Sequence, residues 1–264
     1  MKTLLKKLTV IAAALVLAIG TVACSGGSEE DTATENNDNK VLIGFDNTFV
    51  PMGFLDEDEN IVGFDIDLAK EVFSRLDKEV EFQTIDWSMK ETELNNGNVD
   101  ALWNGYSLSP EREKVVSYTD SYLQNKQIIV TMADSGVNSK ADLAGKEVGT
   151  QRESTAQAAI EKDTEFMGTL KDGRPVLYDT YDKALRDLEI GRTSAVAGDE
   201  VLIRYYIGQK GEDKYKVLEE NFGLEDYVVA FAKENTELRD QVNDTLNEMK
   251  EDGTFDEIYN KWFK

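Results

Sequence analysis

In the stretch WNGYSLSPER, residues 103–112, Arg112 directly follows Ser109-Pro110-Glu111, a pattern typical of a helix start. An arginine here needs an explanation, because the chain has 52 acidic and only 29 basic residues. Ser109 can accept from free backbone N–H groups, Pro110 suits the first helical position, and Glu111 suits the positive end of a helix dipole. Arg112 is then expected one turn inside a helix whose N-terminus attracts anions. A guanidinium beside uncommitted backbone donors is suited to binding a carboxylate. The alternative is an exposed arginine paired with a nearby glutamate, and this stretch alone does not decide between them.

Strand-like and helix-like segments alternate along the chain in two series. The first series has strands at 41–46, 79–85, 99–105 and 126–132, and helices at 65–76, 89–94 and from Ser109. The second has strands at 146–151, 175–179, 193–198 and 227–231, with helical segments at 140–145, 154–162, 181–191, 199–208, 237–250 and 254–263. This alternation predicts mainly parallel sheets covered by helices, in two α/β lobes.

Polar residues suited to ligand binding fall where these strands end and the next helices begin. In α/β sheets, ligands bind at the carboxyl ends of strands, close to helix N-termini. The sequence therefore predicts one binding site built from several strand ends. Its residues are Asp46, the stretch Ser107 to Arg112, Ser154 with Thr155, and Asp199.

The composition excludes several classes of catalytic site. The chain has no histidine, and Cys24 is its only cysteine, so Cys/His zinc sites and histidine-based triads are excluded. Carboxylates, hydroxyls, lysine and tyrosine remain for catalysis. We expect no catalytic residue, no metal and no cofactor.

The N-terminus has the pattern of an export signal. Lys2, Lys6 and Lys7 precede an apolar run over residues 8–20, which is short for a membrane span. The run ends at Val22-Ala23-Cys24 and resembles a bacterial lipoprotein signal, with residues 1–23 removed and Cys24 lipidated. The alternative is an ordinary secretory signal with an incidental cysteine. Either signal predicts an exported protein.

The segment after Cys24 and the overall charge limit the partners of the mature protein. Residues 24–40 contain no large apolar side chain and are expected to form a flexible tether. Removing residues 1–23 takes away three lysines and no acidic residue, so the formal net charge changes from −23 to −26. Nucleic acid and anionic lipid head groups would repel such a molecule. Attachment to a membrane is therefore expected to come from the lipid.

The chain resembles the solute-binding proteins of polar amino-acid ABC importers (family 3), which include the histidine- and glutamine-binding proteins. The matching stretches are collinear and cover nearly the whole mature chain. They are DNTFVPMGF (46–54), IVGFDIDLAKEV (61–72), YSLSPER (106–112), DLAGKEVGTQ (142–151) and GDEVLIRYYI (198–207).

The resemblance implies a two-lobed periplasmic-binding-protein-like fold of type II, in which two crossing strands join the lobes and the ligand is enclosed between them. Carried over, lobe 1 is 41–124 with 228–264, and lobe 2 is 125–227, with crossings near 123–126 and 227–229. The implied protein is a lipid-anchored monomer on the outer face of the cell membrane. It would deliver an amino acid to the membrane permease of an ABC importer.

The resemblance also assigns roles to the charged anchors. Arg112 would hold the α-carboxylate of the ligand, with help from Ser107 and from the backbone N–H groups of Ser154 and Thr155. Asp199 would accept the α-ammonium. The structural alternative for Asp199 is a helix N-cap.

Five further positions match residues near the ammonium or the side chain of the ligand. Gly105 would present its backbone carbonyl to the ammonium, and Asn104 adjoins it. Asp46 and Phe49 would contact the ligand side chain, and Trp87 would form a second apolar wall. The structural alternative for Trp87 is the lobe core, where we also expect Trp103 and the pair Tyr205-Tyr206.

Two departures from the family pattern fall near the expected pocket. Glu153 stands where the family often has glycine, and Met52 where it often has phenylalanine. With Asp46 expected to face the pocket and Glu153 to lie close to it, a cationic amino acid is the leading ligand hypothesis, because carboxylates repel an acidic side chain. Glutamine, histidine and cystine remain alternatives.

Two other functions compete with amino-acid binding. Dehydratases of the same fold act on arogenate-like or prephenate-like acids, and Glu153 could supply their acid if burial raised its pKa. A receptor's sensor domain would need a transmembrane helix after the fold, and the sequence shows none before Lys264. The charged pair of Arg112 and Asp199 favours plain binding.

Overall fold

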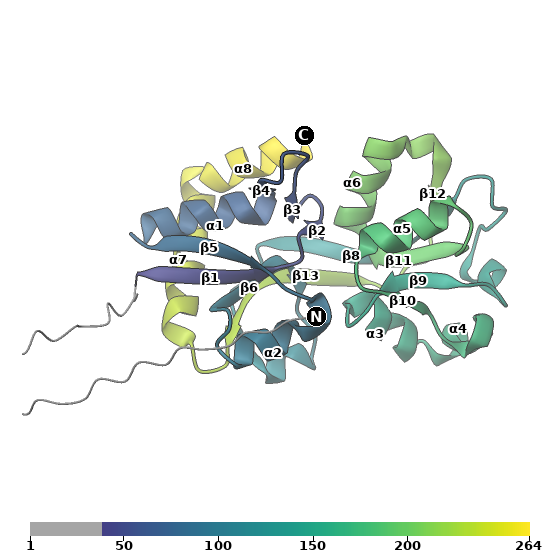
Figure 1. Cartoon of the computed structure of the whole chain (residues 1–264), viewed down its shortest axis with the longest axis horizontal. Coiled ribbons are helices and arrows are strands. Elements are labelled where there is room, and N and C mark those ends of the chain that lie inside the picture. Colours follow the sequence, from purple (N-terminus) through teal and green to yellow (C-terminus); the bar gives the residue numbers. More distant parts are fainter. Residues whose placement is uncertain (1–38) are drawn as a thin grey trace, which may run out of the picture. The chain divides into compact units, whose positions relative to one another are not determined.

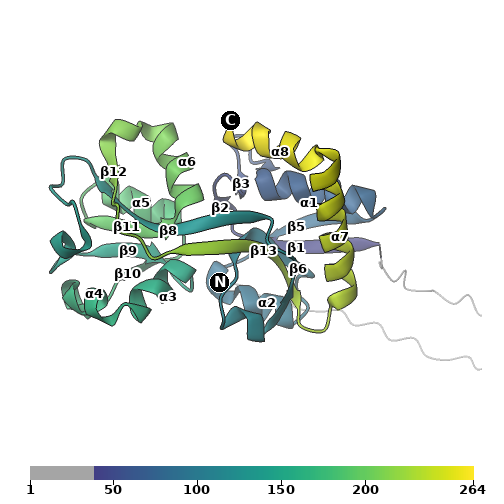
Figure 2. The same ribbon diagram turned by 180° about the vertical axis from the view of Figure 1, so that it is seen from behind.

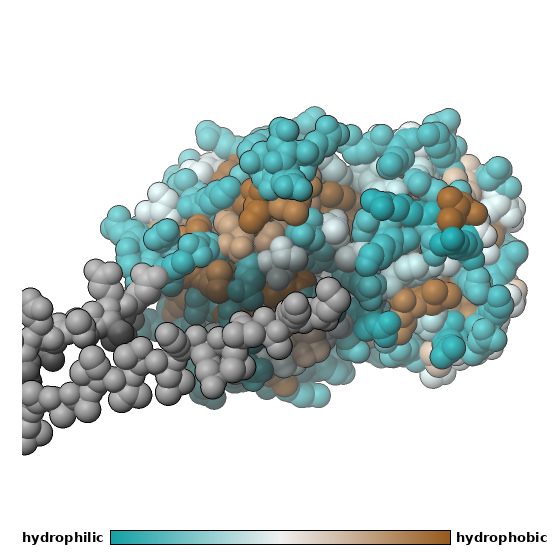
Figure 3. Space-filling view, viewed as in Figure 1, coloured by the Kyte–Doolittle hydropathy of each residue, from teal (hydrophilic) through white to brown (hydrophobic). Residues whose placement is uncertain are grey.

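The computed structural model describes residues 39–264, which form one compact unit by their mutual contacts. The signal segment, Cys24 and nearly all of the expected tether lie outside the described residues. Within 39–264, no helix has both the length and the apolar character needed to cross a bilayer. Hydrophilic residues cover most of the face shown in Figure 3, which agrees with the formal net charge of −23.

The first lobe is built on three neighbouring parallel strands in the order β6–β1–β5. Residues 79–84 pair with residues 40–45 in unbroken register. Figure 1 shows α1 and α8 on one side of these strands and α2 on the other, and Figure 2 shows α7 running across them. The elements of this lobe are β1 (Lys40–Phe45), β2 (Thr48–Phe49), β3 (Gly53–Leu55), β4 (Ile61–Val62), α1 (Phe64–Arg75), β5 (Glu79–Thr84), α2 (Lys90–Asn95), β6 (Ala101–Ser107), β7 (Val116–Tyr118), α7 (Thr236–Asp252) and α8 (Thr254–Phe263).

The second lobe repeats this architecture with the parallel strands β10, β9 and β11. The helices α3, α4, α5 and α6 lie around them (Figure 1). Its elements are β9 (Val148–Gln151), α3 (Thr155–Lys162), α4 (Thr164–Thr169), β10 (Val176–Tyr178), α5 (Tyr181–Glu189), β11 (Ala195–Asp199), α6 (Glu200–Lys210) and β12 (Tyr215–Val217).

Two long strands, β8 (Leu123–Met132) and β13 (Leu224–Ala232), join the lobes. They pair antiparallel where residues 123–126 face residues 224–227, and Figure 2 shows them side by side. Beyond this pairing, β8 continues beside β11 and β13 continues beside β6. The predicted two-lobed fold with two crossing strands is confirmed. The residue bounds of the lobes stay a prediction.

An aromatic cluster around Phe64 fastens the C-terminal helix to the first lobe. The ring of Phe64 is fully buried and packs against three rings of α8. Its centroid lies 5.7 Å from that of Phe255, 6.1 Å from that of Tyr259 and 5.1 Å from that of Phe263. Edge-to-face ring pairs of this kind add to the free energy of burial. The cluster fixes α8 against α1 and so holds the first residue of α1 beside the strands that carry the site.

Most predicted elements are confirmed within about two residues, but the helix expected from Ser109 is wrong. The structure has only a 3-10 turn at Arg112–Lys114, and β7 begins two residues later at Val116. The chain leaves the turn at once because β7 pairs with β13, and that pairing needs residues 116–118 extended. Ser109 still acts locally, since its Oγ accepts from the backbone N–H of Arg112 at 3.2 Å.

Candidate functional site

The predicted site residues lie at strand ends, as the sequence analysis expects. Asp46 follows β1, Ser107 ends β6, and Asp199 ends β11. The side chain of Asn104 on β6 ties two of these ends together, because its Oδ1 accepts from the backbone N–H of Asp46 at 3.0 Å. Phe49 lies beside Gly105 and contacts Tyr181 of the second lobe, with ring centroids 6.0 Å apart. The structure therefore brings together groups from both lobes.

Asp199 is held by three donors and is 4% exposed. Its Oδ1 accepts from Asn125 Nδ2 at 2.6 Å, from Gln127 Nε2 at 3.0 Å and from the Tyr227 hydroxyl at 2.7 Å. Asp199 occupies the N-cap position of α6, but its side chain makes no cap hydrogen bond there, so its carboxylate has another role. Because all three donors reach Oδ1, Oδ2 is left to accept from a further donor.

The electrostatic surroundings of Asp199 favour a cation. Burial, followed by the negative charge of Glu225, raises the pKa of Asp199 to about 7. Glu225 is linked to the same cluster, since its Oε2 accepts from Gln127 Nε2 at 2.8 Å and from Thr155 Oγ1 at 2.9 Å. An ammonium group at Oδ2 would restore the charged form of the carboxylate.

Arg112 lies at the boundary between the lobes, and its side chain is 11% exposed. Its Nη1 donates to the Ser107 carbonyl at 2.8 Å, its Nη2 donates to the Glu153 carbonyl at 3.0 Å, and its Nε lies 3.3 Å from Glu91 Oε1. The guanidinium also lies over the ring of Tyr106, 4.6 Å from its centroid. Arg112 is therefore not an exposed surface arginine. Three of its five N–H groups are engaged, and two remain for a ligand.

The groups predicted to assist Arg112 are partly available. Ser107 Oγ is buried and has no hydrogen-bond partner within the described chain. The backbone N–H of Thr155 occupies the first position of α3 and has no helical partner. The N–H of Ser154, by contrast, donates to the Gln151 carbonyl at 3.4 Å, and its hydroxyl caps α3 through the N–H of Gln157 at 3.1 Å.

Asp46 is buried and connects the lobes through Gln151. Its Oδ1 accepts from the backbone N–H and the hydroxyl of Thr48 at 2.9 and 2.7 Å, and its Oδ2 accepts from Gln151 Nε2 at 2.7 Å. Burial raises the pKa of Asp46. The other amide atom, Gln151 Oε1, is buried without a donor. Two acceptors, one of them anionic, therefore lie together at this point.

No residue with a side chain fits at position 105. It has φ +58°, and a Cβ there would lie 2.7 Å from Phe49 Cε1. Its N–H donates to Asp65 Oδ2 at 2.7 Å, which fixes this part of β6. A left-handed backbone and the close approach of Phe49 both exclude a larger residue.

Several aromatic and sulfur-containing residues belong to the core. Trp87 is 7% exposed and packs against Tyr106 with ring centroids 6.2 Å apart, in a cluster of buried apolar residues. Its place at the ligand stays a prediction. Met52 and Trp103 are fully buried in the main core, so the departure at Met52 does not change the surface of a cavity.

Glu153 lines a cavity beside Arg112, so the expectation that its carboxylate lies close to the ligand stays a prediction. The residue is exposed and has φ +55°, a left-handed conformation that explains the family's glycine at this position. The dehydratase alternative needed burial to raise the pKa of this carboxyl, and that burial is absent in the structure.

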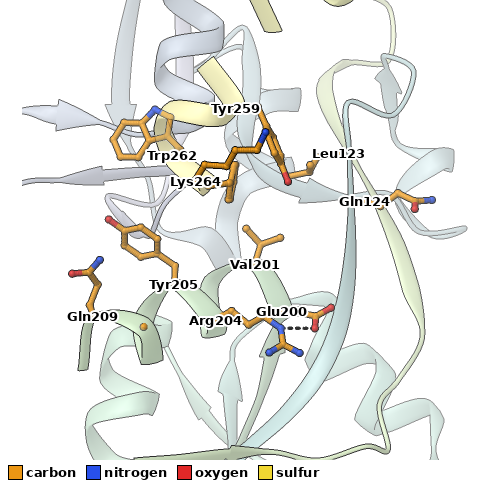
Figure 4. A pocket seen from close by; sticks show the side chains of 12 residues that line it. Leu123, Gln124, Glu200, Val201, Arg204, Tyr205, Gln209, Tyr259, Trp262 and Lys264 are labelled. Atoms are coloured by element: carbon orange, nitrogen blue, oxygen red, sulfur yellow. Dashed lines mark hydrogen bonds and ion pairs between the residues drawn. The ribbon is translucent and has the colours of Figure 1, made fainter. Parts of the chain in front are cut away.

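Two cavities adjoin the boundary between the lobes. One of about 420 Å³ is lined by Arg112, Ser154 and Thr155 together with Lys90 and Glu91. The larger one, about 550 Å³, lies between α6 and α8 (Figure 4) and contains none of the predicted site residues. Its charged pair, Arg204 with Glu200, is already joined at 2.6 Å. Of the two cavities, only the one beside Arg112 is lined by predicted site residues.

Sequence reasoning missed the residues that hold the anchors. Asn125, Gln127 and Tyr227 lie on the crossing strands, and no motif marks them. Only their position on the crossing strands could have indicated their role, because β8 pairs with the end of β11 that carries Asp199, and β13 pairs with β8. The sequence also did not predict that Lys90 lies near the site, although it is three residues after the predicted site residue Trp87.

The raised pKa of Asp199 predicts a pH dependence of stability. Because the folded-state pKa is about 7 and the unfolded value is near 3.8, the protonated carboxyl favours folding at low pH. This contribution is lost as pH rises through about 7. In ligand-free protein, Asp199→Asn should therefore raise the free energy of unfolding at pH 8, by up to about 4 kcal/mol.

Chemical denaturation of both proteins at pH 5 and pH 8 measures this effect. The variant should gain more over the wild type at pH 8 than at pH 5. Asp226→Asn, an exposed change on β13, is the matched control and should show little difference. A variant less stable than the wild type at pH 8 would contradict the raised pKa.

Comparison with known proteins agrees with this geometry. The family model for bacterial extracellular solute-binding proteins, family 3, matches residues 41–264. The putative ABC transporter arginine-binding protein 2 of Escherichia coli K12 is 31% identical over 247 residues, which cover 91% of this chain and 96% of that protein. The L-cystine-binding protein TcyA of Bacillus subtilis is 25% identical, with 97% of each chain covered.

Solved structures show the same fold with amino acids bound. An ABC uptake transporter substrate-binding protein from Streptococcus pneumoniae with bound histidine has a TM-score of 0.84 and 38% identity, covering 86% of this chain and 93% of that one. An ancestral arginine-binding protein bound to arginine has a TM-score of 0.78 and 36% identity, covering 86% and 99%. This chain belongs to family 3 of the bacterial extracellular solute-binding proteins.

Proposed function

We propose that this protein captures a polar amino acid between its two lobes and delivers it to the membrane permease of an ABC importer. The observation that carries the proposal is the buried Asp199, whose Oδ2 is open and whose pKa is raised to about 7 by burial and by the charge of Glu225. Arg112 and the unpartnered Ser107 Oγ supply donors for a carboxylate. An amino acid carries both complementary charges on one carbon atom. Relatives that bind arginine, cystine and histidine support this assignment.

The side chain of the ligand is proposed to be cationic, with arginine as the leading candidate. Asp46 and Gln151 Oε1 present buried acceptors, and the second of them has no donor within the described residues. A guanidinium, an ammonium or an imidazolium would supply such donors, whereas a glutamate or aspartate side chain would face like charge. Histidine, glutamine and cystine remain the alternatives, since their side chains also donate hydrogen bonds.

We further propose that the protein acts as a monomer without catalytic activity. The exposed Glu153 leaves the enzyme alternative without its buried acid.

Two contacts form only when the lobes are together. They join Asp46 to Gln151 and Phe49 to Tyr181. A closed form of this kind gives the permease a shape that differs from the ligand-free open form.

A thermal-shift screen of the twenty amino acids with ornithine and cystine tests the ligand class. A bound ligand stabilises the folded state by RT ln(1 + [L]/Kd), about 4 kcal/mol at a thousandfold excess over Kd. Arginine, lysine, ornithine or histidine should give the largest rise in melting temperature. Asp46→Asn should reduce the shift for a cationic ligand more than the shift for glutamine.

Asp240→Asn, exposed on α7, controls for the change in net charge and should leave every shift unchanged. A rise produced by glutamate alone would overturn the charge argument. Equal losses for cationic and neutral ligands in Asp46→Asn would show that Asp46 holds the lobes together without reading the side chain.

The proposed membrane anchor is a lipid on Cys24, which lies outside the described residues. The small residues Val22 and Ala23 before the only cysteine, and the polar segment after it, support this proposal. Two acyl chains are enough for stable attachment. Mass spectrometry of the native protein should find a diacylated Cys24 as the mature N-terminus, and Cys24→Ala should release the protein from the membrane. An unmodified N-terminus at another residue would exclude the anchor.

A further inference from the structure

Lys90 is a buried lysine at the boundary between the lobes, and the binding chemistry described above does not use it. Its side chain is 2% exposed, and its Nζ lies 5.4 Å from the ring centroid of Trp87. Nζ donates to the Trp87 carbonyl at 3.2 Å and lies 3.2 Å from Glu91 Oε2, both in the first lobe. A third bond, at 2.9 Å, goes to the Glu153 carbonyl in the second lobe.

The Glu153 carbonyl receives two cationic donors from the first lobe. Arg112 Nη2 reaches the same oxygen at 3.0 Å. Glu153 has φ +55° between β9 and α3, and its N–H donates to Gln157 Oε1 at 2.7 Å, which ties the unfavourable conformation to α3. The second lobe therefore presents one fixed backbone acceptor to Lys90 and Arg112.

The bonds of Lys90 respond differently when the lobes separate. Those to Trp87 and Glu91 stay within the first lobe and survive opening, whereas the bond to Glu153 is lost. Burial and the positive charge of Arg112 lower the pKa of Lys90 to about 8, with Glu91 and Glu153 acting in the opposite direction. The ammonium is therefore mainly charged at pH 7, and its bond to the carbonyl is a charge-assisted one.

We propose that Lys90 is a positioning residue that holds the lobes closed through the Glu153 carbonyl and so sets the affinity for every ligand by the same factor. The inference rests on the proposed function, because it assumes that closure accompanies amino-acid binding. The apparent Kd equals the intrinsic Kd divided by the fraction of competent protein. A residue that changes only this fraction multiplies all dissociation constants equally, whereas a ligand contact changes their ratios.

Titration calorimetry of Lys90→Met with arginine, histidine and glutamine tests this account. Loss of a charge-assisted bond, with Arg112 still present on the same oxygen, should raise each measurable Kd by about five- to thirtyfold. The ratios between ligands should stay within about twofold of the wild type. Lys90→Gln removes the charge but keeps a polar side chain, so a loss that both variants share is not a packing effect.

Lys70→Met is the matched control, because Lys70 is exposed on α1 and the change removes one charge from the same lobe. It should leave every Kd unchanged. Affinities for the Lys90 variants equal to this control would overturn the proposal. Unequal losses across the ligands would also overturn it, since they would identify Lys90 as a ligand contact.

Distances between spin labels placed on exposed sites of the two lobes give a readout that needs no ligand. In ligand-free protein, Lys90→Met should lower the closed fraction relative to the wild type and to Lys70→Met. An unchanged distribution would refute the role of Lys90 even if the binding data agreed. If the wild type binds no amino acid, the proposed function fails, and this measurement still decides what Lys90 does.

Discussion

A buried carboxylate without a cation is the constraint on which the rest of this structure depends. Asp199 is 4% exposed, and no lysine or arginine of the described chain forms an ion pair with it. Three neutral donors fix one oxygen and leave the other open. Burying a charge without a partner destabilises the folded state. A ligand that brings an ammonium group would remove this penalty, so the buried carboxylate would itself contribute to the free energy of binding.

The donors that hold Asp199 connect this charge to the movement of the lobes. Asn125 and Gln127 lie on β8, and Tyr227 lies on β13, so the two crossing strands carry the groups that orient the carboxylate. Because these strands join the lobes, any separation of the lobes would have to bend or twist them. We therefore expect the proposed ammonium site to be coupled to closure through these strands. Arg112, Lys90 and Gln151 add further contacts between the lobes.

The fold and the charged anchors were accessible from the sequence, because they depend on local patterns. Periodic apolar residues predicted two lobes, and the strand-end positions of Asp46, Ser107 and Asp199 predicted a site; its place between the lobes was implied by the family resemblance. The error at Ser109 arose where β7 pairing overrides a local helix signal. The supporting residues were not accessible, since the role of Gln127 depends on a partner 72 positions away in the chain. The left-handed backbone conformation of Glu153 was likewise not accessible, because single residues do not encode it.

The central claim is that Arg112 and Asp199 bind the two backbone charges of one amino acid. Titration calorimetry of the wild type and Arg112→Ala with the preferred amino acid, and with the amine that lacks its carboxylate, tests it most directly. Losing one partner of a buried charge pair weakens binding by roughly 2–5 kcal/mol, about thirtyfold to several thousandfold. We predict that loss for the amino acid and a clearly smaller loss for the amine, which is affected only by the missing bond from Arg112 to the Glu153 carbonyl. An equal loss for both ligands would show that Arg112 does not bind the carboxylate.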